Sequence, residues 1–578
     1  MRVVCVGAGP GGLYAALQLK RRRPDWDVSV VEQNGPDETS GFGVVFSEPT
    51  LARLSSGDPV TYAALLRIAQ QWDPIELRLR GDVIRCSGQG FVGVGRHALL
   101  SMLRVAASDA GVTLRFHATV DPAALPEADV VVVSDGSRSA IRRHLASSFE
   151  PTVETGRSKF IWFGTTMPFE SLTFLFEKSE HGAFAVHAYP FSKEQSTFIV
   201  ETDDEALRSA DLDVPDREES ERRSLAYCEK VFAAHLDGHR LLANQSRWAA
   251  FRTVRCGSWR AGRVVLLGDA AHTAHFSMGS GTKMALEDGL ALADALCGSP
   301  DDIDAALATY EATRRPEVRK VQQASRPSLF WWESFRHVMG RDIEAFAFHF
   351  LTRNLRVTRE SLVRRDPAFA QRIAAWQERT LGSDGGRGAR GLSLVVRGLT
   401  LRNRMIGDAH SADAALRILS PDELKNASSA RTEQRTGVLL RAKDLGAELD
   451  EITELARDAR CDWLELSVPA NERGLRSAAR ARELWPRPLS LRLEPEGRPA
   501  DEVVQLAIRA ANLGVDVISL SWVGKEQPDI VACAEGIRFA SPVLIAVDVG
   551  QSADPDTLIL SGRADLCVIR PAPPAPSA

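Results

Sequence analysis

A glycine-rich turn close to the start of the chain constrains the fold more than any other feature of the sequence. Residues 7–12 read Gly-Ala-Gly-Pro-Gly-Gly and match the pattern G-x-G-x-x-G. A short apolar run, Val3–Val6, comes directly before them, as expected for a strand that is buried on both faces. Leucines at helical spacing follow between Leu13 and Arg22. The turn therefore connects a strand to a helix, which is the local arrangement of a Rossmann-like unit.

The spacing of the glycines in this turn fits a site for a dinucleotide. Gly7 permits a tight turn, Gly9 lets the backbone approach a pyrophosphate, and Gly12 lets the helix and strand pack closely. The turn, which includes Pro10, leads into a helix whose first N–H groups can bind phosphates. Glu32 ends the next predicted strand, where a carboxylate can accept the hydroxyls of an adenosine ribose. We expect dinucleotide binding rather than a purely structural turn.

Two later segments repeat the pattern of a strand followed by a polar turn. Val130–Val133 leads into D-G-x-x-S-x-x-R at 135–142, and Val264–Leu267 leads into Gly-Asp-Ala-Ala-His at 268–272. An aspartate at a strand end can bind ribose or ribitol hydroxyls, and the turn at 279–282 opens a helix whose N-terminus can face a negatively charged ring edge. Each turn alone is compatible with a structural role, but three in this order indicate one nucleotide cofactor. The residues expected to contact it are Asp135, Gly136, Gly268, Asp269, Gly279, Gly281 and Thr282.

The composition is that of a globular protein with several domains. The chain has 578 residues, of which 44% are hydrophobic and 25% charged. A net charge of −5 gives no reason to expect nucleic acid as a partner. The eight cysteines form no C-x-x-C pair, so we expect reduced thiols, no metal site and a cytoplasmic location. The longest apolar runs have the length of a strand, so we expect no membrane span.

Changes of pattern along the chain predict the domain organisation. Aromatic, strand-like segments predict a mostly antiparallel sheet inserted into the nucleotide-binding part, and a glycine-rich linker separates a second α/β region. The predicted parts are a nucleotide-binding subdomain (about 1–75, 93–155 and 252–300), the inserted sheet (about 76–92 and 156–251), a helical part (301–378) that completes the first domain (1–378), the linker (379–392), the second domain (393–572) and a tail (573–578).

The three motifs resemble those of the single-component, FAD-containing aromatic monooxygenases. The resemblance implies a Rossmann-like FAD domain interleaved with a substrate-binding sheet, and NADH or NADPH as co-substrate. It also implies that Gly7, Gly9, Gly12 and Glu32 hold the ADP half of FAD. Arg96 would contact the flavin phosphate or ribityl region, and Asp269 would bind the ribityl pyrophosphate portion. Asp135 and Gly136 would serve both FAD and the nicotinamide nucleotide. The family usually has proline four residues after the histidine of G-D-A-A-H, where this chain has Phe276. We expect a reshaped loop beside the flavin ring.

Longer segments resemble a narrower group within these monooxygenases. Gly156–Thr165, His187–Pro190, Ser196–Glu201 and Gly268–Gly281 look like the salicylyl-CoA 5-hydroxylases, the 2-aminobenzoyl-CoA monooxygenase/reductases and the hydroxylases of violacein synthesis, and Phe346–Arg353 favours the aryl-CoA enzymes. This implies hydroxylation of a small aromatic acid derivative, held as a CoA thioester, through a flavin C4a-hydroperoxide. Two alternatives stay open: a tryptophan-derived or carrier-bound aromatic substrate, and a flavin-binding redox partner or substrate-holding protein that does not hydroxylate.

Three side chains are candidates for the substrate cavity. His187 and Tyr189 alternate with an alanine on a predicted strand and therefore share one face of it. His275 lies close to the expected flavin ring. Satisfied core or surface polar residues are the alternative for His187 and Tyr189, and His272, within the G-D-A-A-H motif, is expected to shape its loop. A base would help by deprotonating a phenol or aniline substrate.

The C-terminal region resembles part of an old-yellow-enzyme barrel, in segments such as Leu399–Arg404, Asp462–Leu466 and Leu489–Arg492. A complete (β/α)8 barrel takes about 250 residues, and this region has roughly 180. The segment from Arg404 to about Glu448 looks too short for the early strands and helices. The paired active-site residues of old yellow enzymes are replaced in this chain. The carboxylate of Asp548 would repel an FMN phosphate. We therefore expect a degenerate, partial (β/α) barrel without FMN or catalysis, serving in packing or in a homodimer.

Overall fold

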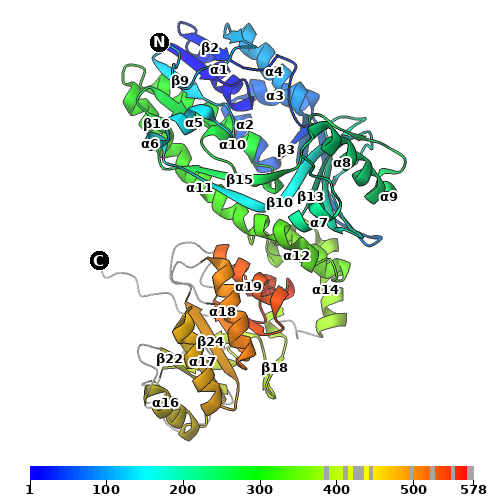
Figure 1. Cartoon of the computed structure of the whole chain (residues 1–578), viewed down its shortest axis with the longest axis vertical. Helices are drawn as coiled ribbons and strands as arrows, with labels where there is room; N and C mark the ends of the chain where they lie inside the picture. Colours follow the sequence, from blue (N-terminus) through cyan, green and yellow to red (C-terminus); the bar gives the residue numbers. More distant parts are fainter. Residues whose placement is uncertain are drawn as a thin grey trace. The chain divides into compact units, whose positions relative to one another are not determined.

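The computed structural model describes residues 1–382, 389–407, 414–420, 423, 435–441, 447–494, 499–520, 528–548 and 554–568. The chain forms two compact units, Met1–Met339 and Gly340–Ala578 (Figure 1). The predicted tail at 573–578 lies outside the described residues, as do residues 383–388 of the predicted linker. No helix in the described ranges is long and apolar enough to cross a bilayer.

A six-stranded sheet in the order β16-β17-β9-β1-β2-β8 forms the core of the first unit. The strands are β1 (Arg2–Val6), β2 (Asp27–Val31), β8 (Thr113–Arg115), β9 (Val130–Val133), β16 (Arg260–Ala261) and β17 (Val264–Leu266). All its pairs are parallel except β16 with β17. In the ladder Leu266 lies beside Val133, Val133 beside Val6, and Val6 beside Val31. The carboxyl ends of four strands therefore meet at one edge, and each of the three polar turns begins there.

Helices pack around this sheet through small residues. Helix α1 packs against α10 and α4, and a Cβ on Gly289 of α10 would lie 3.0 Å from the Ala15 nitrogen of α1. The helices of this region are α1 (Pro10–Arg22), α2 (Glu48–Gly57), α3 (Pro59–Ile68), α4 (Arg96–Asp109), α5 (Ala140–His144), α6 (Ala146–Phe149), α10 (Gly281–Gly298) and α11 (Ile303–Ser334). A small antiparallel sheet lies beside them, with β3 (Gly43–Ser47), β7 (Phe91–Gly95) and β4 (Gln70–Trp72).

The inserted sheet is mostly antiparallel, as predicted, and has eight strands in the order β14-β10-β13-β12-β11-β5-β6, with β15 paired to β10. Its strands are β5 (Ile75–Leu79), β6 (Asp82–Cys86), β10 (Pro151–Thr165), β11 (Leu172–Ser179), β12 (Gly182–Pro190), β13 (Ser196–Thr202), β14 (Leu241–Leu242) and β15 (Ala249–Cys256). The pair β5 and β11 is parallel. The long strands β10 and β15 run side by side (Figure 1), with a shift of register between Thr155 and Lys159.

One face of this sheet, here called the outer face, packs against short helices. Apolar side chains of β10 to β13, among them Phe184, Val186 and Phe198, form a core cluster with residues of α7 (Asp204–Ser209), α8 (Arg217–Val231) and α9 (Ala233–Leu236). Because side chains alternate along a strand, His187 and Tyr189 lie on the opposite, inner face.

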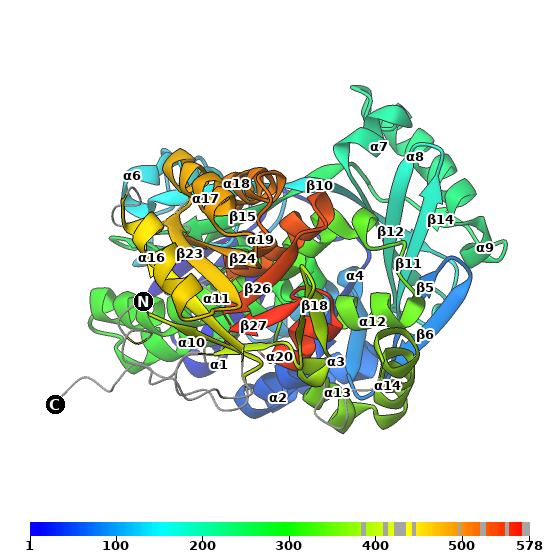
Figure 2. The same ribbon diagram turned by 90° about the horizontal axis from the view of Figure 1, so that it is seen from below.

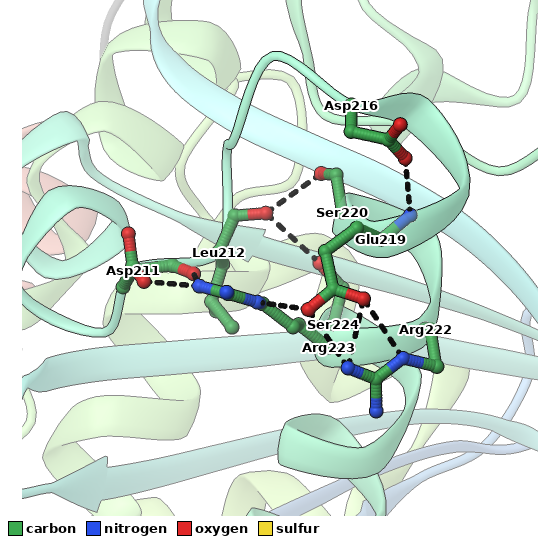
Figure 3. A network of polar contacts seen from close by, with 8 residues as sticks. All are labelled: Asp211, Leu212, Asp216, Glu219, Ser220, Arg222, Arg223 and Ser224. Atoms are coloured by element: carbon green, nitrogen blue, oxygen red, sulfur yellow. Dashed lines mark hydrogen bonds and ion pairs between the residues drawn. The ribbon is translucent and has the colours of Figure 1, made fainter.

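The first turns of α8 are held by the polar network in Figure 3. Asp216 caps the helix by accepting the Glu219 N–H at 2.8 Å, and the hydroxyl of Ser220 donates to the Leu212 carbonyl at 2.7 Å. Glu219 also accepts hydrogen bonds from Arg222 and Arg223. A capping aspartate satisfies an N–H group that the helix itself leaves without a partner, so the network fixes the helical layer on the outer face.

The second unit begins with helices rather than with the predicted linker. They are α12 (Ile343–Leu351), α13 (Arg359–Arg365) and α14 (Pro367–Leu381). A buried polar cluster joins α12 to the C-terminal barrel: Arg563 donates to Glu535 at 2.7 Å and to Thr352 at 3.0 Å, and His349 lies 3.1 Å from Glu535. The sequence predicts all of 301–378 within the first domain, whereas the structure groups the helices from α12 onward with the barrel.

The barrel sheet contains eight parallel strands and is closed, because β20 pairs with β27 as well as with β21. The strands are β20 (Met405–Gly407), β21 (Leu416–Leu419), β22 (Arg435–Arg441), β23 (Trp463–Pro469), β24 (Leu489–Glu494), β25 (Val517–Leu520), β26 (Leu544–Asp548) and β27 (Leu566–Val568). Figure 2 shows β23 beside β24 and β26 beside β27. The hairpin β18 (Leu394–Val396) and β19 (Leu399–Leu401) precedes the barrel and adds Val396 and Leu401 to its core cluster.

The predicted C-terminal (β/α) barrel is present, and its described strands close the ladder. The barrel helices whose bounds the structure gives are α16 (Ala447–Asp458), α17 (Glu472–Leu484), α18 (Ala500–Asn512), α19 (Pro528–Ala540) and α20 (Pro555–Leu560), and Glu423, between β21 and β22, is also helical. Only eight residues, 408–415, separate β20 from β21, which is too few for a helical crossover. The expectation that 404–448 is too short for the early strands fails, because three strands of three to seven residues fit there.

Candidate functional site

The turn after β1 has the shape that the glycine motif predicts. Gly7 has a φ of +105°, and a Cβ there would lie 2.5 Å from the carbonyl oxygen of Ser134. A Cβ on Gly12 would overlap the carbonyl oxygen of Gly7. Gly9 differs, since no protein atom lies within 4 Å of a Cβ added to it. Two glycines are therefore required by the protein's own packing, and Gly9 leaves room for a ligand to approach the backbone.

Helix α1 begins in this turn without a side-chain cap. Gly9 is the N-cap residue and Pro10 occupies the first turn, where proline's missing N–H costs nothing. The free N–H groups at such an N-terminus bind phosphate groups well.

Glu32 holds the glycine turn in place. Its Oε2 accepts the N–H of Ala8 at 2.8 Å and its Oε1 accepts the N–H of Asn34 at 2.9 Å. Carboxylate oxygens each have two lone pairs, so both can accept a further hydrogen bond. Contact with a ribose hydroxyl remains a prediction, and the structure adds a positioning role for the same side chain.

The second turn, after β9, carries an unpaired acceptor. Asp135 accepts the Ala140 N–H through Oδ2 at 3.0 Å, while its Oδ1 is buried and has no hydrogen-bond partner among the described residues. Burial raises the pKa of Asp135, against the lowering effect of hydrogen bonds from Ser139 and Ala140. Gly136 has a φ of +86° with open space around its Cα. A buried oxygen without a partner calls for a donor from a bound molecule.

Arg142 joins the second turn to the third. Its guanidinium is buried and donates to the carbonyl oxygens of Ser137, at 2.6 Å, and Ala270, at 2.7 Å. The final arginine of the D-G-x-x-S-x-x-R pattern therefore fixes the distance between the two motifs.

The third turn, after β17, is held in place by Asp288 of α10. This carboxylate accepts hydrogen bonds from the Gly268 N–H at 3.1 Å and from Arg314 at 2.8 Å, and pairs with His272 at 2.7 Å. Although burial alone would raise the pKa of Asp288, His272 and Arg314 hold it below its usual value. His272 thus shapes the loop, as expected. Asp269 is exposed between buried neighbours.

The loop then leads into the N-terminus of α10. Gly279 has a φ of +58°, a conformation that favours glycine. Ser280, the N-cap residue, makes no cap with its side chain, and its buried Oγ has no partner among the described residues. Gly281 and Thr282 form the first turn of the helix, and a Cβ on Gly281 would meet no atom within 4 Å.

Arg96 is held at the start of α4 by the loop before β3. It starts α4, its Nε donates to Thr39 at 3.1 Å, and its backbone N–H donates to Phe42 at 2.6 Å. Burial lowers the pKa of Arg96, and the nearby Asp269 and Tyr189 oppose that shift. The predicted residues Arg96 and Asp269 are therefore close enough to interact electrostatically.

The three substrate-cavity candidates are all buried. Tyr189 donates its hydroxyl to the carbonyl oxygen of Gly43 at 2.8 Å, and burial raises its pKa well above the usual value. His187 pairs with Glu201, whose Oε1 lies 2.6 Å from Nε2. His275 bonds to Ser277 at 2.8 Å through Nδ1. The structure gives each a protein partner, and their contact with a substrate stays a prediction.

An aromatic layer connects two of these candidates. Phe276, which stands where the family usually has proline, stacks on His275 at 4.4 Å between ring centroids and lies 5.3 Å from the ring of His187. It also contacts Phe160 at 4.8 Å. The loop is thus filled by a large ring that reaches the inner face of the inserted sheet.

Sequence reasoning missed Glu201 and Arg142 as site residues. Glu201 lies on β13, and the register places Ile199 opposite His187, so Glu201 is the diagonal neighbour of His187. An acidic residue in the strand that follows a histidine-bearing strand is the only signal, and it needs the register to be read. In the middle of β10, Arg157 lies 3.6 Å from Glu333 and Lys159 lies 3.2 Å from Asp204.

The residues at this edge of the sheet fit FAD. Gly9 leaves an open approach to the backbone, α1 and α10 begin without side-chain caps, and buried oxygens of Asp135 and Ser280 lack partners in the described protein. The ADP half would bind at the turns after β1, β2 and β9, and the flavin half near Asp269 and the start of α10.

Comparison with known proteins agrees with this geometry. Residues 1–325 match the family described as FAD binding domain. The chain is 50% identical over 383 residues to salicyloyl-CoA 5-hydroxylase of Streptomyces sp, covering 65% of this chain and 74% of that protein. It is 37% identical over 332 residues to 3-hydroxy-4-methyl-anthranilyl-(aryl-carrier protein) 5-monooxygenase of Streptosporangium sibiricum, covering 57% and 89%. It is 33% identical over 380 residues to protodeoxyviolaceinate monooxygenase of Chromobacterium violaceum, covering 64% and 98%. The chain belongs to the family of FAD-binding monooxygenases.

Proposed function

We propose that this chain is an FAD-dependent aromatic hydroxylase that uses NAD(P)H and O2, with an aromatic CoA thioester of the salicylyl-CoA or 2-aminobenzoyl-CoA type as substrate. The observation that carries the proposal is the meeting of three nucleotide-binding turns at one sheet edge, next to a sheet with an aromatic inner face. The 50% identity to salicyloyl-CoA 5-hydroxylase supports the thioester.

Bound FAD would supply the redox chemistry. The chain's own residues bind, orient and shield. Glu32 and Arg142 fix the turns that would hold the cofactor, and the N-terminus of α10 would present N–H groups to it. The aromatic layer around Phe276 would exclude water from the reacting ring.

The test is a panel of salicyl-CoA, 2-aminobenzoyl-CoA and the matching free acids, each given to the FAD-loaded protein with NADH or NADPH and 18O2. We expect a thioester to accelerate oxidation of the nucleotide and to yield a product heavier by one labelled oxygen. Conversion of the free acids alone would contradict the thioester, and the separate use of NADH and NADPH identifies the reductant.

A carrier-bound or tryptophan-derived aromatic is the second candidate substrate. The identities to the aryl-carrier protein and protodeoxyviolaceinate enzymes favour it. Aryl groups loaded on a carrier protein, included in the same panel, separate this candidate from a CoA thioester.

A protein that binds flavin without hydroxylating is the alternative from another class. Such a protein would contain FAD, yet its NAD(P)H oxidation would not respond to any aromatic compound and no labelled product would form. Both readouts come from the same panel.

We further propose that the C-terminal barrel has a packing or dimerisation role and no FMN chemistry. Arg492 and Arg563 of the barrel are both engaged in ion pairs, with Glu465 and Glu535. Flavin extracted from the purified protein should be FAD alone, and stoichiometric FMN would refute the proposal. Sedimentation of the full chain tests for a homodimer.

A cytoplasmic location agrees with the cysteines. All eight are free thiols, and seven of them are buried. Proteins exported to oxidising compartments more often pair their cysteines. Cell fractionation followed by detection of the full chain tests the location.

A further inference from the structure

The inner face of the inserted sheet contains a histidine–glutamate pair that no motif of the cofactor site uses. His187 on β12 and Glu201 on β13 have only 4% and 1% of their surfaces exposed. Nε2 of the histidine lies 2.6 Å from Oε1 of the glutamate. When Glu201 is ionised, Nε2 carries the proton and Nδ1 becomes the basic nitrogen of the ring.

Aromatic rings surround this pair. The ring of His187 lies 4.0 Å from that of Trp332 on α11, 5.1 Å from Phe174 on β11 and 5.3 Å from Phe276. A buried ion pair is on average no more stabilising than apolar residues of the same volume. Stability therefore does not explain a carboxylate in an aromatic layer, and groups of this kind gather at functional sites.

The pair lies one ring away from the loop that leads into α10. Phe276 belongs to the segment between the third cofactor motif and Gly281, the first residue of that helix. It contacts His187 directly and is itself stacked on His275. Through Phe276, the loop that leads into α10 is therefore in contact with the His187 imidazole.

We propose that His187 is the base that accepts the proton of the substrate's ring hydroxyl or amino group, and that Glu201 is the residue that positions it. This rests on the proposed function. In the step, the O–H or N–H bond of the substrate breaks, the proton moves to Nδ1 of His187, and the electron pair stays on the substrate. The resulting imidazolium is stabilised by the Glu201 carboxylate, and nothing is oxidised or reduced. The ionised ring is richer in electrons and so more readily hydroxylated.

The chain contains a matched control for this pair. His235 on α9 and Glu177 on β11 form the same contact, with Nε2 and Oε1 2.7 Å apart, but on the side of the sheet covered by the helices. A substitution there removes an equivalent pair without touching the inner face.

The first test uses absorbance of a bound ligand, without turnover. Salicyl-CoA is added to the FAD-loaded protein in the absence of oxygen and NAD(P)H, and benzoyl-CoA, which lacks the hydroxyl, serves as the reference ligand. We expect the red-shifted band of the ionised hydroxyl with the unsubstituted protein and with His235→Gln. His187→Gln and Glu201→Gln should bind salicyl-CoA with the spectrum of the neutral phenol and should bind benzoyl-CoA normally.

The second test is the rate of hydroxylation. General-base catalysis contributes about 10²- to 10⁴-fold, so kcat should fall within that range in His187→Gln and in Glu201→Gln, with KM little changed. The double variant should be no slower than His187→Gln, because the two residues act as a unit. FAD content equal to that of the unsubstituted protein shows that each variant has folded.

Two results would overturn the proposal and differ from each other. If the unsubstituted protein hydroxylates salicyl-CoA but binds it as the neutral phenol, or if Glu201→Gln keeps the ionised spectrum, only this proposal fails. If the unsubstituted protein neither binds nor hydroxylates any aromatic ligand of the panel, the proposed function is wrong, and so is the role of His187 that rests on it.

Discussion

Replacing Glu32 by glutamine removes a charge that organises the glycine turn while it leaves the packing almost unchanged. One carboxylate oxygen accepts the N–H of Ala8 at 2.8 Å, and the other accepts the N–H of Asn34 at 2.9 Å. Glutamine keeps one acceptor oxygen and presents an NH2 group to the second N–H. One charge-assisted hydrogen bond is therefore lost, and the remaining one becomes weaker.

The expected effect on FAD binding follows from these contacts. A hydrogen bond to a charged group contributes about 1.5–3 kcal/mol. Its loss lowers the fraction of molecules whose turn can receive a dinucleotide, and the apparent Kd rises in proportion. Since about 1.4 kcal/mol corresponds to a factor of ten, Glu32→Gln should bind FAD up to about 10- to 150-fold more weakly.

The assay is titration of the deflavinated protein with FAD, followed by competition with ADP and with FMN. Glu32 acts at the adenine end, so FAD and ADP should lose the same factor while FMN loses none. Glu38→Gln, a change at an exposed carboxylate of the same segment, is the matched control and should behave like the unsubstituted protein. Binding of FAD and ADP within twofold of normal by Glu32→Gln would refute the assignment of this turn.

Three further predictions concern the glycine turn, the barrel unit and the outer helices. Gly9→Ala should have the normal melting temperature but bind FAD more weakly, because only a ligand approaches that position. Gly12→Ala should lose thermal stability as well, because its Cβ would overlap the Gly7 carbonyl. Equal melting temperatures of the two variants would contradict this prediction. Burial and the charge of Arg563 lower the pKa of His349 to about 3, so between pH 7.5 and 5 only the unfolded chain takes up this proton and the second unit loses about 2 kcal/mol of unfolding free energy. Urea unfolding at both pH values should show a smaller loss in His349→Gln, and an identical loss would refute the shift. Asp216→Ala should destabilise the protein by about 1 kcal/mol through loss of the α8 cap without changing FAD affinity, which thermal melting and FAD titration measure.

The three turns of the expected cofactor site could be located from the sequence because each of them is local. A strand, a glycine turn and a helix follow one another within about twenty residues, and the geometry of each turn depends on residues inside it. The resemblance to aromatic monooxygenases, which rests on those turns, is confirmed by the family match. What the sequence did not show is that Arg142 joins two motifs through Ala270, because that contact spans 128 positions.

The closed barrel, in contrast, could not be predicted from local sequence patterns. Its first three strands are short, and only eight residues lie between β20 and β21, so the sequence pattern that signals such a barrel is weak there. Closure depends on pairing between β20 and β27, about 160 residues apart. Local patterns carry no information about a ladder of that span, and chain length misled the prediction because the connection between β20 and β21 has only eight residues.

The loop that contains Phe276 connects the edge of the sheet at which the cofactor would bind to the inner face of the inserted sheet. Its beginning is fixed by Asp288 through His272 and Gly268, and its end by the left-handed turn at Gly279. Both ends serve the edge at which the cofactor would bind. The middle of the loop instead lies against the inner face of the inserted sheet, where Phe276 contacts His187. A change at Phe276 can therefore alter which aromatic ring is accepted while the cofactor turns stay as they are, so Phe276→Pro should shift preference within the substrate panel more than it shifts the Kd for FAD. Equal changes in both would show that the loop acts as one unit.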